Sequence, residues 1–110
     1  MIEDILREII TRFNEKAASD EKLKAELAGM RRTVLISLDD GRSFNFRLED
    51  AKASALETGS IDNPDIAIES SEETINQLYK GEIRVMRALA LKKVRVNGSL
   101  EDILRLRKFF

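Results

Sequence analysis

Apolar residues recur at intervals of three and four over residues 1–17, with charged residues between them. This spacing predicts an amphipathic helix with one apolar stripe. The stripe consists of Ile2, Ile5, Leu6, Ile9, Ile10, Phe13 and Ala17. It must be covered, either by the rest of the chain or by a second copy. A short second helix is expected to follow, capped by Ser19, carrying Leu23 and Leu27, and ended by Gly29.

The next stretch alternates between apolar and polar residues, which is the period of a half-buried strand. Two such runs, residues 33–38 and 43–48, flank the turn residues Asp39-Asp40-Gly41, and together they predict a β-hairpin. Its apolar positions are Val34, Ile36, Leu38, Phe44, Phe46 and Leu48. The Ala-rich residues 52–57 indicate a weaker third strand, whose small side chains leave room beside the sheet.

A turn at Asn63-Pro64-Asp65 separates this region from a short buried strand, Ile66-Ala67-Ile68. Ser70, with Glu73 three residues later, is a capping-box signature. A helix is therefore expected to begin at this point and to end at Gly81.

The last part of the chain repeats the order of strand, cap and helix. An apolar segment, residues 83–91, leads into an alternating strand at residues 93–96, and Asn97-Gly98 turns the chain. Ser99 is placed to cap a final helix, with Asp102 three residues on. This helix is expected to run to the C-terminus.

Length and composition favour a single domain over residues 1–110, since a chain of this size buries roughly 60–70% of its unfolded surface. Charged residues make up 35% of the chain and Cys is absent, a balance that favours a thermostable protein. No apolar run is long enough to span a bilayer, so we expect a cytoplasmic protein. The absence of Cys and His leaves no thiol nucleophile, imidazole base or ordinary zinc site.

Charge is distributed unevenly along the chain. Residues 80–110 carry nine cations and three anions, although the whole chain has a formal net charge of −1. This basic third is either a solvated face or a surface for an anionic lipid headgroup layer. Nucleic acid is the less favoured partner, because Tyr79 is the single aromatic residue near these cations before Phe109 and Phe110.

The two carboxylate pairs are weak candidates for catalysis. Asp39-Asp40 lies in a turn and Glu72-Glu73 in a helix cap, where solvated structural roles are usual. Acid-base chemistry would need one member to be buried so that its pKa rises. The ligand spacing of a calcium loop is also absent. We therefore expect no enzymatic activity, no metal site and no cofactor.

The order of these elements resembles the lipid-binding domain of the sterol carrier protein family of the second type. The stretches that carry the resemblance are "DGRSFNFRL", "PDIAIESSEETINQLYKGEI" and "RALALKKVRVNGSLEDILRLRKFF". The family motifs correspond here to Pro64-Asp65, Ser71-Glu72-Glu73, Gly81 and the run from Lys93 to Gly98. Residues 30–110 match best, and the helices of residues 1–29 fit less specifically.

Three departures from the family pattern fall near one another. Arg84-Val85-Met86 replaces the usual Asn-Pro-Gln, Lys92 replaces a frequent Gly, and Leu89-Ala90 replaces a frequent aromatic pair. These positions would shape the mouth of a cavity, so the departures bear on the identity of the ligand more than on the fold.

The resemblance implies an α+β fold in which helices pack on one face of a roughly five-stranded, curved and mainly antiparallel sheet. It also implies an apolar tunnel for sterols, fatty acids or acyl-CoA. An empty tunnel of about 300 Å³ would cost about 7 kcal/mol, comparable with the whole stability of a small domain. Such a cavity must therefore be filled, collapsed or much smaller.

The resemblance leads to a set of candidate lipid-binding residues, each of which is alternatively an ordinary core residue. Met86 is the foremost, because its flexible thioether adapts to different ligands. The set is Phe44, Phe46, Leu78, Tyr79, Met86, Leu89, Ile103, Leu104 and Phe110.

Two functions follow from these expectations. The first is non-catalytic binding or carriage of an apolar ligand, such as a fatty acid, acyl-CoA or sterol-like lipid, with transient docking on an anionic membrane surface. The alternative is a scaffold or protein-interaction module of the same fold, with a filled cavity and a homodimer contact through the first helix.

Overall fold

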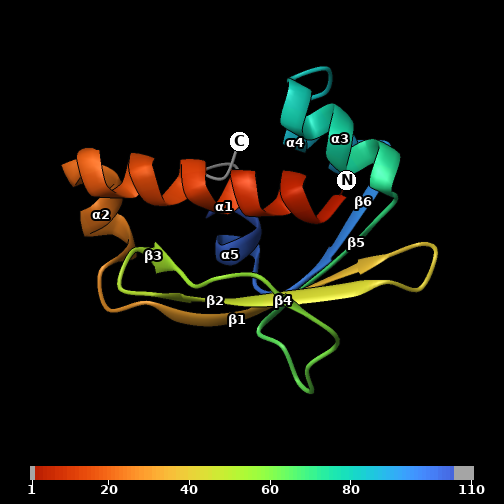
Figure 1. Cartoon of the computed structure of the whole chain (residues 1–110). Coiled ribbons are helices and arrows are strands. Elements are labelled where there is room, and N and C mark those ends of the chain that lie inside the picture. Colours follow the sequence, from red (N-terminus) through yellow and green to blue (C-terminus); the bar gives the residue numbers. More distant parts are fainter. Residues whose placement is uncertain (1, 106–110) are drawn as a thin grey trace.

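A computed structural model of the protein describes residues 2–105, so the predicted role of Phe110 lies outside the described residues. In Figure 1 the helices all lie on one side of a twisted sheet. The elements in chain order are α1 (Ile2–Ser19), α2 (Glu21–Leu27), β1 (Arg31–Leu38), β2 (Ser43–Glu49), β3 (Lys52–Ala53), β4 (Glu57–Thr58), β5 (Ile66–Ser70), α3 (Glu72–Lys80), α4 (Val85–Ala90), β6 (Val94–Asn97) and α5 (Leu100–Arg105).

The sheet is mixed, and its strands follow the order β3-β2-β1-β5-β6. β1 and β5 are parallel neighbours, with Val34 opposite Ile66, while the remaining pairs are antiparallel. The expected α+β architecture, a mainly antiparallel sheet with helices on one face, is therefore confirmed.

The weak third strand divides into two short strands, β3 and β4, which pair with opposite ends of β2. Ser54 lies between them and replaces part of the strand pairing. Its backbone N–H donates to the carbonyl of Arg47 at 2.8 Å, and its hydroxyl accepts from the Arg47 N–H at 2.8 Å. The side-chain bond holds the chain against β2 while residues 54–56 leave the regular ladder.

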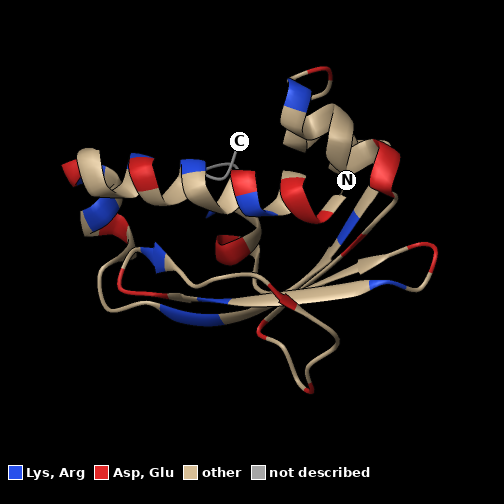
Figure 2. Cartoon of the chain, in the orientation of Figure 1, with Lys and Arg blue, Asp and Glu red and all other residues tan. Residues whose placement is uncertain are grey.

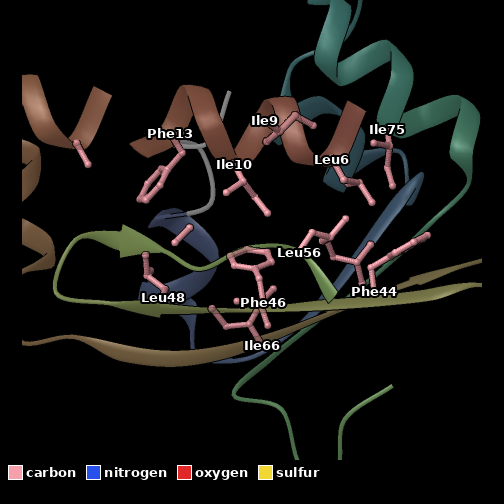
Figure 3. Packing of buried hydrophobic residues seen from close by; sticks show 14 of the residues in the cluster. Leu6, Ile9, Ile10, Phe13, Phe44, Phe46, Leu48, Leu56, Ile66 and Ile75 are labelled. Carbon is pink, nitrogen blue, oxygen red and sulfur yellow. The ribbon is translucent and has the colours of Figure 1, made fainter. Parts of the chain in front are cut away.

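The main core lies between α1 and the inner face of the sheet. In Figure 3 the side chains of Leu6, Ile10 and Phe13 extend from α1 towards those of Phe46 and Leu48 on β2. Phe13 and Phe44 are each 1% exposed. The apolar stripe of α1 is thus covered by the chain's own sheet, and it offers no surface for the homodimer considered above. Figure 2 shows charged residues of both signs along the rest of α1.

Two predicted helix starts were wrong by one residue. The hydroxyl of Ser71, not Ser70, accepts the hydrogen bond of the Thr74 N–H at 3.1 Å, because Ser70 still belongs to β5 and pairs with Val94. Similarly, Asp20 caps α2, because α1 continues through Ser19.

The predicted end of α3 and the predicted start of α5 are confirmed. Gly81 follows α3 in the left-handed conformation, at φ 75°, which glycine adopts without steric cost. The Ser99 hydroxyl accepts from the backbone N–H of Asp102 at 3.1 Å at the start of α5.

One side-chain amide joins α1 to the edge of the sheet. The Nδ2 of Asn14 donates to the carbonyl of Ala53 at 2.9 Å, and the Oδ1 accepts from the Ala53 N–H at 2.7 Å. The amide thus pairs with β3 as a neighbouring strand would. Since Ala53 is 2% exposed, water has little access to replace these bonds.

We expect Asn14→Ala to lower the free energy of unfolding by about 1–3 kcal/mol, because it leaves the buried N–H and C=O of Ala53 without partners. Urea denaturation measures the change. Glu15→Ala, at the exposed neighbouring position, is the matched control and should change the free energy by about 0.5 kcal/mol or less. Equal effects of the two substitutions would contradict the role of the amide.

A buried carboxylate attaches α5 to the sheet. Asp102 is 4% exposed, and its Oδ2 accepts from Arg32 Nε of β1 at 2.9 Å. Its Oδ1 accepts from Arg105 Nη1 at 3.0 Å. Burial by itself raises the pKa of the Asp102 carboxyl, but the hydrogen bond from Arg32, supported by the other contacts, outweighs it and holds the pKa below its usual range.

Because this pKa is lowered by folding, the carboxylate stabilises the protein above about pH 4, and the stabilisation is lost as the pH falls through the lowered pKa. We expect Asp102→Asn to cost about 1–3 kcal/mol at neutral pH. The difference from the unsubstituted protein should shrink towards about pH 2–3 in urea denaturation.

Glu101→Gln is the control for this pH dependence, since its side chain is 78% exposed on the same helix. It should have little effect at either pH. A cost of Asp102→Asn that is independent of pH would show that the charge of the carboxylate is not what stabilises α5.

Candidate functional site

The buried apolar residues form two clusters that meet on the inner face of the sheet. The larger cluster joins α1 and α2 to β1, β2 and β5. The smaller one is built on Leu78 of α3, Ala88 of α4 and Val94 of β6. Ile68 and Val96 pack against both clusters. The interior is therefore continuous across the sheet floor but divided among the helices above it.

A cavity of about 70 Å³ lies where the two clusters meet. Its floor is the inner face of four strands, and its walls are α1, α3 and the start of α4. The lining residues are Leu6, Ile9, Ile10, Ile36, Phe46, Ile68, Ser70, Ile75, Leu78, Val85, Val94 and Val96. Figure 3 shows Leu6 and Ile10 reaching from α1, and Ile75 from α3, towards the sheet.

The lining of the cavity is almost entirely aliphatic and carries no charge. Among its described residues Ser70 alone has a polar side chain, and it is 2% exposed. Its hydroxyl is within hydrogen-bonding distance of the carbonyls of Ser71, at 3.2 Å, and Lys93, at 3.4 Å. The cavity therefore suits an apolar group. A charged headgroup would have to remain outside it, because burying an unpaired charge is costly.

A contact between an arginine and a tyrosine joins α1 to α3. Arg12 Cζ lies 4.5 Å from the centroid of the Tyr79 ring, and Arg12 Nη2 donates to the Tyr79 hydroxyl at 3.3 Å. Glu8 holds the same guanidinium through Nε at 3.3 Å. A ligand that entered between α1 and α3 would have to displace this cation–π contact.

The structure brings two of the predicted lipid-binding residues, Phe46 and Leu78, to the cavity wall. Phe44 is buried in the larger cluster, and Tyr79 packs at its edge. Leu89 packs against the smaller cluster.

The remaining described candidates lie away from the cavity. Met86 is 47% exposed and Leu104 is 43% exposed, while Ile103 is half-buried on α5. None of these three lines the cavity.

Sequence reasoning missed most of the wall. Its α1 contribution belongs to the predicted helical stripe, and Val94 and Val96 belong to a predicted alternating strand. Periodicity therefore identified these residues as inward-facing, but it does not distinguish a residue beside a cavity from one in a packed core. Only the position of α4, which brings Val85 over β6, completes the wall.

One member of each carboxylate pair is held by a structural contact. Arg42 forms ion pairs with Asp40 in the hairpin turn and with Glu72 at the start of α3. The hydrogen bonds from Arg42 hold the pKa of the exposed Asp40 carboxyl below its usual range. Within residues 2–105 no cluster of three or more acidic side chains is arranged to hold a metal ion. None of the helices described there has the length and apolar character to cross a bilayer.

Solved structures with the same fold include carriers and part of a larger enzyme. Palmitated SCP2L2 from Aedes aegypti has a TM-score of 0.67 and 17% identity, covering 91% of this chain and 88% of that one. Apo sterol carrier protein 2 from Yarrowia lipolytica has a TM-score of 0.60 and 18% identity, covering 98% and 85%. These identities establish similarity of fold.

The inverting sec-alkylsulfatase Pisa1 from Pseudomonas sp. is also similar, with a TM-score of 0.62 and 15% identity over 77% of this chain. The match spans 13% of the sulfatase chain, so this fold occupies a small part of that protein.

Comparison of the sequence with curated proteins found no match. The profile of the SCP-2 sterol transfer family, in contrast, matches residues 10–110. This range contains α2 to α5, every strand of the sheet and more than half of α1. The chain therefore belongs to the SCP-2 sterol transfer family.

Proposed function

We propose that this protein binds and carries an apolar ligand in the cavity between the sheet and its helices, without catalysing a reaction. The observation that carries the proposal is the charge-free and almost entirely apolar lining contributed by α1, α3, α4 and four strands. Membership of a sterol transfer family supports the same class of ligand.

The cavity must expand to hold a ligand. Its 70 Å³ is well below the roughly 300–1,000 Å³ of typical small-molecule sites. At about 24 cal/mol per Å³, a cavity of this size costs about 2 kcal/mol, which a small domain tolerates. The small volume in the structure is thus compatible with stability, and the ligand itself would fill the space that opens as the helices separate.

The smaller cluster offers the easier route for that expansion. α4 contains six residues, and its N-cap residue Arg84 provides no side-chain capping bond. Such a short helix has little stability of its own, so it depends on the packing of Val85, Ala88 and Leu89. We infer that α4 moves more readily than α1, whose 18 residues pack along the larger cluster.

Hydrophobic burial is sufficient to drive uptake. An acyl chain gains about 0.8 kcal/mol for each CH₂ removed from water, so about a dozen methylenes supply roughly 10 kcal/mol. After the costs of association and helix movement, micromolar affinity is a reasonable outcome. Fatty acids, acyl-CoA and sterol-like lipids are the proposed ligand classes, and palmitated SCP2L2 is a relative of this fold with a fatty acyl group.

The proposal predicts saturable one-to-one binding of a fluorescent fatty acid, displaced by unlabelled fatty acid, acyl-CoA or sterol in order of preference. Val96→Phe should weaken binding about tenfold or more, because the larger side chain extends from the sheet floor into the cavity. Fluorescence titration measures both.

Leu35→Phe is the matched control, since Leu35 lies on β1 but on the opposite face of the sheet from Val34 and Ile36. It should bind as the unsubstituted protein does. Equal weakening by both substitutions would argue against binding in the cavity. A folded protein that takes up none of these ligands would contradict the proposal and favour the interaction-module alternative.

A further inference from the structure

The segment from Lys80 to Lys93, here called the α4 segment, exposes large apolar side chains. Met86 is 47% exposed and Leu91 is 50% exposed. Large hydrophobic residues elsewhere in the described chain are mostly buried, apart from Leu100 and Leu104 on α5. Single exposed apolar residues are common, but two in so short a segment indicate a contact surface.

The same segment is strongly basic. It contains five cations and one anion, Glu82, within a chain of net charge −1. The cations are Lys80, Arg84, Arg87, Lys92 and Lys93, and all are exposed. None of them forms an ion pair with another described residue. In contrast, the other two described arginines of residues 80–110 form ion pairs: Arg95 with Glu69, and Arg105 with Asp102.

The helical geometry of α4 places its exposed residues and its cavity-lining residue on different sides. At 100° per residue, Val85, Ala88 and Leu89 share one side of α4, and this side packs on the smaller cluster. Arg87 falls opposite this side, and Met86 and Leu91 lie on its two flanks, where both are exposed. Val85 lines the cavity while the adjacent Met86 is exposed, so the helix has one side towards the proposed ligand and the other towards solvent.

We propose that the α4 segment docks on membranes rich in anionic lipid, with Met86 and Leu91 entering the headgroup layer and the surrounding cations contacting the headgroups. This places against the bilayer the end of the cavity that α4 closes. The transfer of ligand at this contact rests on the proposed function, whereas the docking itself does not.

Charge and size favour a membrane over other occupants. A short amphipathic segment with cations beside apolar residues is suited to the interface of an anionic bilayer. A stable protein partner needs about 800 Å² on each side, which two half-exposed side chains and flexible cations do not supply. Single-stranded nucleic acid requires aromatic residues for stacking, and the α4 segment has Tyr79 only as a neighbour, already occupied by Arg12.

Vesicle co-sedimentation tests the docking without any added ligand. The protein should bind vesicles of phosphatidylcholine and phosphatidylglycerol in a seven-to-three ratio, and binding should fall as NaCl rises from roughly 0.05 to 0.5 M. Arg84→Gln with Arg87→Gln should lower partitioning roughly twentyfold, and Met86→Ser with Leu91→Ser roughly tenfold or more. Pure phosphatidylcholine vesicles should bind far less.

Matched controls use exposed residues elsewhere on the surface. Lys22→Gln with Lys24→Gln removes the same charge from α2, and Leu100→Ser removes the most exposed leucine among residues 2–105, at 73%. Each should change partitioning by roughly twofold or less. Equal losses in the controls, or no binding to the anionic vesicles, would overturn the proposal.

A tryptophan reporter tests insertion directly, because the chain has no Trp. The fluorescence of Met86→Trp should shift to the blue on addition of anionic vesicles, whereas that of Leu100→Trp should not. Sensitivity to loss of the arginines but not to loss of Met86 and Leu91 would indicate a general polyanion site and overturn insertion.

Titration with the fluorescent fatty acid separates the two proposals. Vesicle binding without fatty-acid uptake would leave the docking intact and contradict the proposed function. Uptake in solution without vesicle binding would contradict the docking and leave the proposed function intact. The charge variants should take up fatty acid normally in solution, since neither Arg84 nor Arg87 lines the cavity.

Discussion

The sheet has one apolar face, and the need to remove that face from water determines the rest of the architecture. Its inner positions carry Val34, Ile36, Phe46, Ile66 and Val94, whereas the cross-strand pair Glu69 and Arg95 marks the outer face. A sheet face that is four strands wide is broader than one helix can cover, because a helix with its side chains is about 10–12 Å across. The helices therefore cover the face in separate groups (Figure 1).

The grouping of the helices over the sheet has consequences for function. The long helix α1 covers one part of the sheet. Asn14 attaches α1 to β3 by hydrogen bonds, and Asp102 attaches α5 to β1. The second group consists of α3, which also contacts α1, and α4, which depends on a few aliphatic contacts and packs chiefly on β6. The cavity lies at the boundary between α1 and this second group of helices. In our proposal α4 both moves to admit the ligand and carries the membrane-binding residues.

Particular residues show how far sequence reasoning reached into the site. Alternation in the hairpin places Phe46 on the apolar face, and Leu78 lies on the inward side of a capped helix, but only the family resemblance makes them lipid-binding candidates. The flexible thioether of Met86 makes it the foremost candidate by chemistry, yet Met86 is exposed, while its neighbour Val85 lines the cavity. A short helix within an apolar run has no clear periodicity to show which of two adjacent residues faces inward.

By itself the sequence determined the elements that depend on neighbours in the chain. The stripe of α1, the hairpin around Asp39-Asp40-Gly41, the stop at Gly81 and the cap at Ser99 are local, because helical period, turn chemistry and capping act over a few residues. The tertiary structure alone decided the parallel pairing of β1 with β5, the contact of Arg32 with Asp102 and the position of the cavity. These features join segments that are distant in the chain, and they depend on how the helices share a single apolar face.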